Sequence, residues 1–195
     1  ALATAAPNTK EPNAPATFRI AARRTAGRGA RARVETLVAI ACQLAEALAA
    51  AHEKNIVHRD LKPANVMVSS SGRIKILDFG LAKVDEASSP AFDAETMMET
   101  SDGLVLGTLP YMSPEQLEGR PLDARTDIFS LGVMVHEMAT GTRPFEGGSP
   151  AALLSSILRD APHPVTERRP ELPGELGSLI GRCLEKDRAR RVQTA

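Results

Sequence analysis

The first long apolar pattern of the chain lies between Val34 and Lys54. Its apolar residues recur at spacings of three and four positions: Leu37, Ile40, Ala41, Leu44, Ala45 and Leu48. This spacing places them on one face of an α-helix. The sequence therefore predicts an amphipathic helix over 34–54, closed by Asn55.

Three short β-like runs follow this helix, at 56–57, 66–68 and 74–77. The last two are joined by the sequence Ser-Ser-Ser-Gly at 69–72, a composition typical of a hairpin turn. The polar loop at 58–65 and the segment that begins at Asp78 therefore lie beside paired strands. We expect the pairing to bring the polar residues of these two loops together.

Helical periodicity returns after a polar, unpatterned stretch at 86–107, which is typical of a loop. One helix is predicted around 128–138 and ends at Gly141. A second begins with Ser149 as N-cap and Pro150 in the first helical position. A third follows Pro173, with an apolar face of Leu176, Leu179, Ile180, Cys183 and Leu184.

The charge balance excludes a strongly basic or acidic protein. The 195 residues hold 24 Lys and Arg against 24 Asp and Glu, so no nucleic acid or anionic membrane is expected as a partner. Glu35, Gln43 and Glu46 interrupt the most apolar stretch, and we predict no membrane span in this chain. The two cysteines lie far apart in apolar patterns, which favours a reduced, cytoplasmic location.

Residues 1–33 differ from the rest of the chain, because they carry many alanines and arginines and little apolar periodicity. We interpret them as a disordered or atypical leader. Seven Lys or Arg against one Glu in this stretch also fit an organellar transit peptide or a nucleic-acid contact.

Three short motifs carry the candidate chemistry. His58-Arg59-Asp60-Leu61-Lys62-Pro63-Ala64-Asn65 is followed by Asp78-Phe79-Gly80 and then by Ser113-Pro114-Glu115. In this order they resemble the catalytic loop, the magnesium-binding triplet and the end of the activation segment of protein kinases. The sequence is similar to the bacterial members of the eukaryotic-type serine/threonine kinases. The resemblance implies a mainly α fold, the large C-terminal lobe of a kinase at 34–195, truncated at its final helix, with short β-hairpins carrying the catalytic loop.

The resemblance also implies a role for each polar residue of the motifs. Asp60 corresponds to the base that accepts the proton of a substrate hydroxyl, and Lys62 to the cation that meets the transferred phosphate. Asn65 and Asp78 offer the hard oxygen ligands that Mg²⁺ prefers, and they would hold ions that bridge the phosphates of ATP. The implied reaction transfers the γ-phosphate of ATP to Ser or Thr hydroxyls of protein substrates.

Lys62 and Thr108 also indicate the substrate class. A lysine two residues after the catalytic aspartate is the serine/threonine pattern, and the Thr108 hydroxyl is expected to bridge Asp60 and Lys62. Taken one at a time these residues have ordinary structural readings, in which Asp60 or Asp78 caps a turn, Asn65 ends a strand and Thr108 is a loop residue.

Other residues are expected to support the site without taking part in the chemistry. Asp127 resembles the aspartate that accepts hydrogen bonds from the catalytic-loop backbone, and His58 is expected to stack on Phe79. Glu115 and Arg191 resemble a buried ion pair, although Arg188 stands where the family usually has a proline. His52, His136 and His163 have no partner spacing and are interpreted as packing or surface residues.

A regulatory site is implied at Arg59, since an arginine at this position commonly receives a phosphate placed on the activation segment. The candidate phosphate acceptors are Thr96, Thr100 and Ser101.

The small β-rich lobe that binds ATP in kinases is not recognisable ahead of Val34, and Gly27-Arg28-Gly29 only imitates part of its glycine-rich loop. The sequence therefore leaves two functions open. One is a piece of an active kinase. The other is a non-catalytic kinase remnant or pseudokinase-like module that binds peptides or proteins without ATP turnover.

Overall fold

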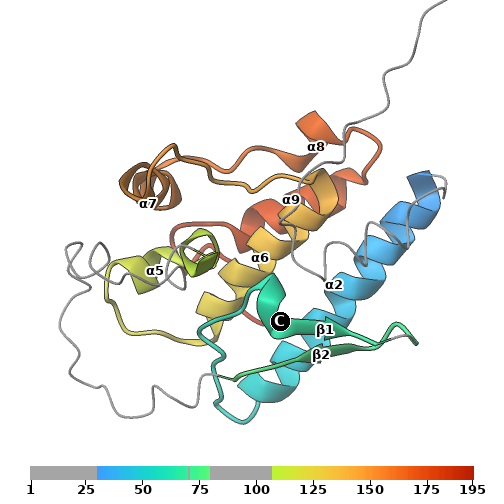
Figure 1. The fold of residues 1–195 in the computed structure, drawn as a ribbon, viewed down its shortest axis with the longest axis horizontal. Helices are drawn as coiled ribbons and strands as arrows, with labels where there is room; N and C mark the ends of the chain where they lie inside the picture. The colour runs from blue at the N-terminus through green and yellow to red at the C-terminus, as the bar shows by residue number, and fades with distance from the viewer. Residues whose placement is uncertain (1–29, 70, 80–106) are drawn as a thin grey trace, which may run out of the picture.

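The computed structural model describes residues 30–69, 71–79 and 107–195, which form a mainly helical structure with a two-stranded hairpin (Figure 1). The segment predicted as a loop at 86–107 lies outside the described residues, except for Gly107.

The helix predicted after the leader is α2 (Ala30–His52). It begins ahead of Val34, where an ion pair between Arg31 and Glu35 spans one turn. Its apolar face is buried at Leu37, Ile40, Leu44 and Leu48. Asn55 follows the helix with a φ of 58°, the left-handed conformation that asparagine tolerates at a helix end.

Within the described residues, α2 is also the one helix long and apolar enough to cross a membrane. A buried core helix satisfies the same criteria of length and composition. Gln43 in the middle of α2 accepts a hydrogen bond from Ile74 N at 3.0 Å and donates to Gly72 O at 3.3 Å. The polar side chain that interrupts the apolar stretch therefore ties α2 to the hairpin.

The hairpin consists of β1 (Val66–Val68) and β2 (Ile74–Ile76), paired antiparallel with Val66 opposite Ile76. It lies against α2 (Figure 1). The strand predicted at 56–57 is wrong, since this segment is irregular. Ile56 N donates to Ala51 O at 3.0 Å, so the backbone folds back on the end of α2 instead of pairing with a strand.

The core is built around α6 (Ala124–Thr140), which packs on α2 and on α9 (Gly174–Cys183) (Figure 1). A Cβ atom placed on Gly132 would lie 2.7 Å from Cys183 Cβ, so the glycine allows α6 and α9 to approach closely. α6 ends at Gly141, as predicted, with a φ of 80°.

Shorter elements complete the structure. They are the 3₁₀ turns η1 (Pro63–Asn65) and η3 (Leu109–Tyr111) and the helices α5 (Pro114–Leu117), α7 (Pro150–Arg159) and α8 (Val165–Arg168). α7 has the predicted cap, in which the Ser149 side chain accepts a hydrogen bond from Ala152 N. The loop at 58–65 ends in η1, which leads directly into β1.

Candidate active site

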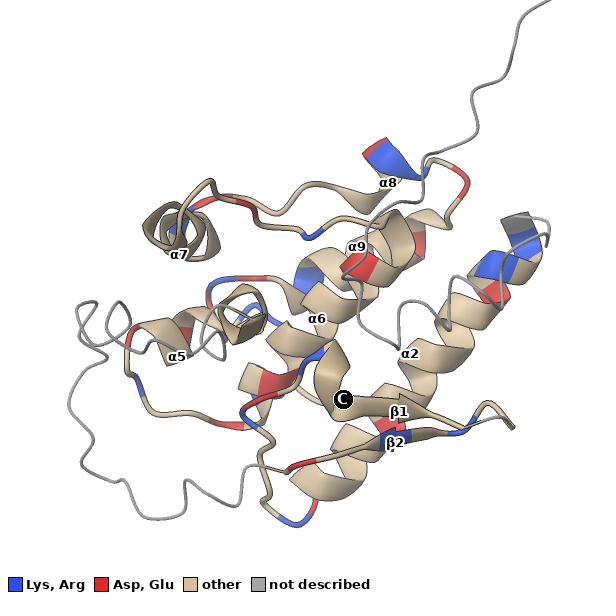
Figure 2. Cartoon of the chain, viewed as in Figure 1, with Lys and Arg blue, Asp and Glu red and all other residues tan. Residues whose placement is uncertain are grey.

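The loop at 58–65 is held in place by buried residues at both of its ends. His58 is fully buried, Leu61 and Pro63 are buried within the loop, and Leu77 N donates to Asn65 O at 2.8 Å. This last bond joins the loop to the end of β2. Both signs of charge occur around η1 and the N-terminal end of α6 (Figure 2). The short hairpin therefore does what the sequence predicts, because it brings the two polar loops side by side.

Lys62 lies between Asp60 and Thr108. Its Nζ atom is 2.9 Å from Asp60 Oδ2 and donates to Thr108 Oγ1 at 2.8 Å. The Asp60 side chain is 41% exposed, whereas that of Lys62 is 18% exposed. The three residues named from the sequence thus meet at one point, with the lysine ammonium as the group that contacts the other two.

Asn65 contacts the same carboxylate oxygen as Lys62. Its Nδ2 atom donates to Asp60 O at 2.8 Å and to Asp60 Oδ2 at 3.1 Å. Both bonds engage the amide nitrogen and not the amide oxygen, which is the atom suited to a hard cation. Asn65 can therefore position Asp60 and offer an oxygen ligand at the same time.

Asp78 is exposed at the end of the hairpin and has a φ of 53°, which is rare for a non-glycine residue. Next to it, the Phe79 ring lies 4.8 Å from the His58 ring, centroid to centroid. Asp60 N donates to His58 Nδ1 at 3.2 Å, and His58 Nε2 lies 2.9 Å from Leu77 O. Because Nδ1 is an acceptor here, Nε2 carries the proton and donates to the carbonyl. His58 thereby links the two loops.

Asp127 is completely buried at the first turn of α6, where a carboxylate is favoured by the helix N-terminus. Its Oδ1 accepts from Arg59 N at 2.9 Å, and its Oδ2 accepts from His58 N at 2.8 Å. Arg59 has a φ of 66°, so these bonds hold a strained backbone. Asp127 therefore fixes the backbone of the loop at two consecutive residues.

Glu115 and Arg191 form a buried, two-pronged ion pair. Arg191 Nη1 lies 2.6 Å from Glu115 Oε1 and Nη2 lies 3.0 Å from Oε2, with side chains 0% and 2% exposed. Burial alone raises the pKa of Glu115, but the hydrogen bonds and charge of Arg191 outweigh it and hold that pKa below its ordinary value. Arg188, at the position of the usual proline, donates to Pro121 O and Asp123 Oδ2 instead. The pair joins α5 to the C-terminal end of the chain.

Comparison with known proteins identifies the family. Residues 22–195 match the protein kinase domain. The chain belongs to the protein kinase family. It is 40% identical over 159 residues to a protein of Clostridium acetobutylicum named "probable serine/threonine-protein kinase", covering 82% of this chain and 23% of that protein. It is 42% identical over 158 residues to the serine/threonine-protein kinase Pkn2 of Myxococcus xanthus, covering 78% and 18%. It is 38% identical over 159 residues to PknB of Mycobacterium tuberculosis, covering 82% and 24%.

The chain spans less than a quarter of the length of each of these kinases. The family and the mainly helical fold with its short hairpin agree with what the sequence predicts. The roles of the individual residues stay predictions.

Two residues that contact the predicted motifs have partners that sequence reasoning missed. His52 Nε2 lies 2.8 Å from Asp127 Oδ2, so this histidine has a partner 75 positions away. Gln116 Nε2 donates to Arg59 O at 2.6 Å. The Ser-x-x-Gln pattern at 113–116 is the sequence signal of a capping box and locates the start of α5, but it says nothing of a contact with the catalytic loop.

Asn65 and Asp78 offer oxygen atoms of the kind that Mg²⁺ prefers. Among the described residues no three His, Cys, Asp or Glu side chains gather into a metal site of their own. Mg²⁺ in such sites is held by one or two protein oxygens together with phosphates and waters, so a complete protein cage is not required. Asn65 and Asp78 fit this chemistry. The candidate phosphate acceptors Thr96, Thr100 and Ser101 lie outside the described residues, as does Gly80.

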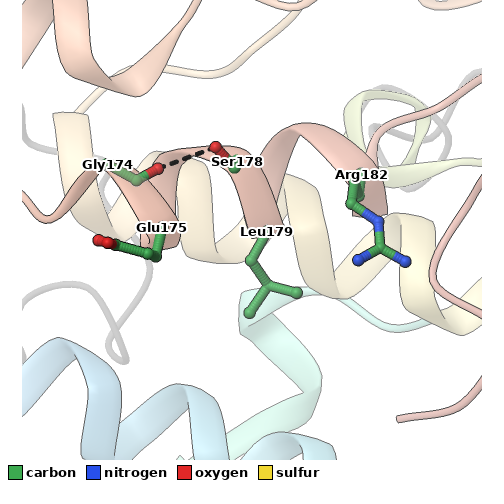
Figure 3. A pocket seen from close by; sticks show the side chains of 5 residues that line it. All are labelled: Gly174, Glu175, Ser178, Leu179 and Arg182. Atoms are coloured by element: carbon green, nitrogen blue, oxygen red, sulfur yellow. Dashed lines mark hydrogen bonds between the residues drawn. The ribbon is translucent and has the colours of Figure 1, made fainter.

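A shallow hollow on α9 is separate from this site. It is lined by Gly174, Glu175, Ser178, Leu179 and Arg182, and in Figure 3 the Ser178 hydroxyl turns back to donate to Gly174 O at 3.0 Å. None of these residues belongs to the predicted kinase motifs.

Proposed function

We propose that this chain carries the catalytic loop of a serine/threonine protein kinase, which transfers the γ-phosphate of ATP to Ser or Thr hydroxyls of proteins. We infer that residues 34–195 are the large lobe of that kinase. The observation that carries the proposal is the meeting of Asp60, Lys62 and Thr108 within hydrogen-bonding distance. Support comes also from relatives named as serine/threonine-protein kinases.

The carboxylate of Asp60 is suited to orient a substrate hydroxyl and to accept its proton. It is more exposed than Lys62, and Asn65 and Lys62 both fix its Oδ2 atom. A base held in one orientation contributes more than a free one, because the reactants do not need to be ordered during the reaction. The Asp60 carboxylate is thus both accessible to a substrate and held in one orientation.

Lys62 supplies positive charge beside that base. Its ammonium contacts both Asp60 and Thr108, so it lies beside the proposed base and would neutralise negative charge on a transferred phosphoryl group. ATP and Mg²⁺, when bound, would supply the phosphoryl group and neutralise the charge on its oxygens. The oxygens of Asn65 and Asp78 would hold the metal ion.

Two conservative substitutions test these roles in the full-length protein. Asp60→Asn keeps the size of the side chain but removes the proton acceptor, so we expect kcat to fall by about 10²–10⁴-fold while the Kd for ATP stays within about twofold. Asp78→Asn should weaken the binding of Mg-ATP as well, and added Mg²⁺ should recover part of the rate.

Steady-state kinetics with a protein substrate and ATP-binding titrations separate the two effects. If Asp60→Asn retained most of its activity, the assignment of the base would be wrong. If the unaltered protein bound protein partners but turned over no ATP, the non-catalytic function would replace the proposed one.

A further inference from the structure

Gln116 uses its side-chain amide for two different tasks. Oε1 accepts a hydrogen bond from Ser113 N at 2.9 Å, which together with the Ser113 cap forms the capping box at the start of α5. Nε2 points away from the helix and donates to Arg59 O at 2.6 Å, across 57 positions of sequence. The capping box needs only the oxygen, because a glutamate serves equally well at this position. The nitrogen therefore has a separate purpose.

The carbonyl that Gln116 binds belongs to the peptide group between Arg59 and Asp60. The N–H of the same peptide group donates to His58 Nδ1 at 3.2 Å. One residue earlier, Arg59 N donates to Asp127 Oδ1 at 2.9 Å. Arg59 has a φ of 66°, a conformation that persists only where surrounding contacts impose it. Gln116 thus holds the last peptide plane before the Asp60 side chain.

We propose that Gln116 is a positioning residue for Asp60, a role that rests on the kinase function proposed above. Its amide N–H fixes the peptide plane between Arg59 and Asp60 and so fixes the direction of the Asp60 carboxylate. The segment at 108–116 then contacts the catalytic loop at two points: Thr108 accepts a hydrogen bond from Lys62, and Gln116 donates one to Arg59 O. The placement of α5 is thereby coupled to the geometry of the base.

Gln116→Glu separates the two tasks, because glutamate keeps the oxygen that accepts from Ser113 N and loses the N–H that Arg59 O needs. The matched control is Gln43→Glu. Gln43 also accepts from a backbone N–H, that of Ile74, and donates to a backbone carbonyl, that of Gly72, but it does so at the hairpin turn.

The first measurement is amide hydrogen exchange by NMR on the 195-residue chain. Gln116→Glu should speed exchange of the Asp60 amide by about fivefold or more with little change in the thermal midpoint, whereas Gln43→Glu should leave Asp60 at the wild-type rate.

The second measurement is turnover by the full-length protein. Gln116→Glu should lower kcat by about tenfold and change the KM for ATP by less than about twofold.

The pH dependence adds a readout that a purely structural role would not move. A protonated glutamate regains an O–H donor for Arg59 O, so the kcat of Gln116→Glu relative to wild type should rise as the pH is lowered from about 6 towards about 4.3, the ordinary pKa of a glutamate. Gln116→Met has neither a donor nor an ionisable group at this position, so its kcat relative to wild type should not change over the same pH range.

An unchanged hydrogen-exchange rate of the Asp60 amide in Gln116→Glu overturns the proposal. A faster exchange rate together with an unchanged kcat overturns it as well. Failure of the kinase function itself gives a different result, because the unaltered protein would then turn over no ATP while the exchange effect of Gln116→Glu remained.

Discussion

Removal of Arg191 is expected to leave a buried negative charge without a partner of opposite sign. Glu115 is 2% exposed and receives both prongs of the guanidinium, and the Thr126 hydroxyl also donates to it at 3.0 Å. Breaking a buried pair from one side typically costs about 3–5 kcal/mol. For a chain of this size each kcal/mol lowers the thermal midpoint by about 2–4 °C. Arg191→Met should therefore unfold roughly 10 °C below the wild type.

A double-mutant cycle tests whether the cost comes from the unpaired charge. Adding Glu115→Gln to Arg191→Met neutralises the buried carboxylate and should recover about 2 kcal/mol, so the two substitutions should be far from additive. Arg31→Met, which removes an exposed ion pair with Glu35, is the control and should change stability by less than about 0.5 kcal/mol. Urea unfolding monitored by circular dichroism measures the wild type and all of these variants.

The same pair predicts an acid dependence with a definite sign. The pKa of Glu115 is lower in the folded state than in the unfolded state, where it is about 4.3. The contribution of Glu115 to the free energy of unfolding is therefore complete above about pH 4.3 and is lost as the pH falls through the folded pKa. Arg191→Met should not show this acid-dependent loss of stability. Additive single substitutions, or an acid profile of Arg191→Met identical to that of the wild type, would refute the pairing as the source of stability.

Three further predictions concern other parts of the chain. Burial lowers the pKa of Lys186 to about 8, and its ammonium donates to Ile157 O at 2.6 Å. Because the unfolded state keeps the proton up to about pH 10.4, the free energy of unfolding should rise between about pH 8 and pH 10.4. Lys186→Met should flatten this rise in urea titrations. Gly132→Ala would place a methyl group 2.7 Å from Cys183 Cβ and should destabilise the fold by about 1–3 kcal/mol in the same assay. In active full-length protein, mass spectrometry should find phosphate on the segment ahead of Thr108, with Arg59 as its partner; the candidates are Thr96, Thr100 and Ser101.

The longer helices were predictable from the sequence because their own periodicity determines which face is buried. Gly141 and Ser149 also marked helix ends correctly, since a left-handed C-cap and a side-chain N-cap are local features. The strand predicted at 56–57 failed for the opposite reason. Its β-branched residues favour a strand, but the backbone hydrogen bond from Ile56 to Ala51 decides the conformation, and no propensity encodes that bond.

The same distinction holds for the site. Asp60, Lys62, Asn65 and Asp78 belong to motifs, so the amino-acid sequence alone is enough to name them. The partnership of His52 with Asp127 and of Gln116 with Arg59 is not predictable in this way, because each joins positions more than fifty residues apart and leaves no periodic trace. Motif residues identify the chemistry, whereas the residues that hold the motif in place are found from contacts.

Backbone strain shows why those supporting contacts matter. Arg59 and Asp78, with φ values of 66° and 53°, adopt a conformation that costs a non-glycine residue about 1–3 kcal/mol, and both lie in the loops that carry the polar residues of the site. Arg59 is held at its N–H by Asp127 and at its carbonyl by Gln116. Asp78 lies between Leu77, whose N–H and carbonyl bond to Asn65 and His58, and Phe79, which packs on the His58 ring. The loops keep their shape because α5, α6 and the hairpin impose it, so a substitution in these supports should change the geometry at Asp60 without touching a motif residue.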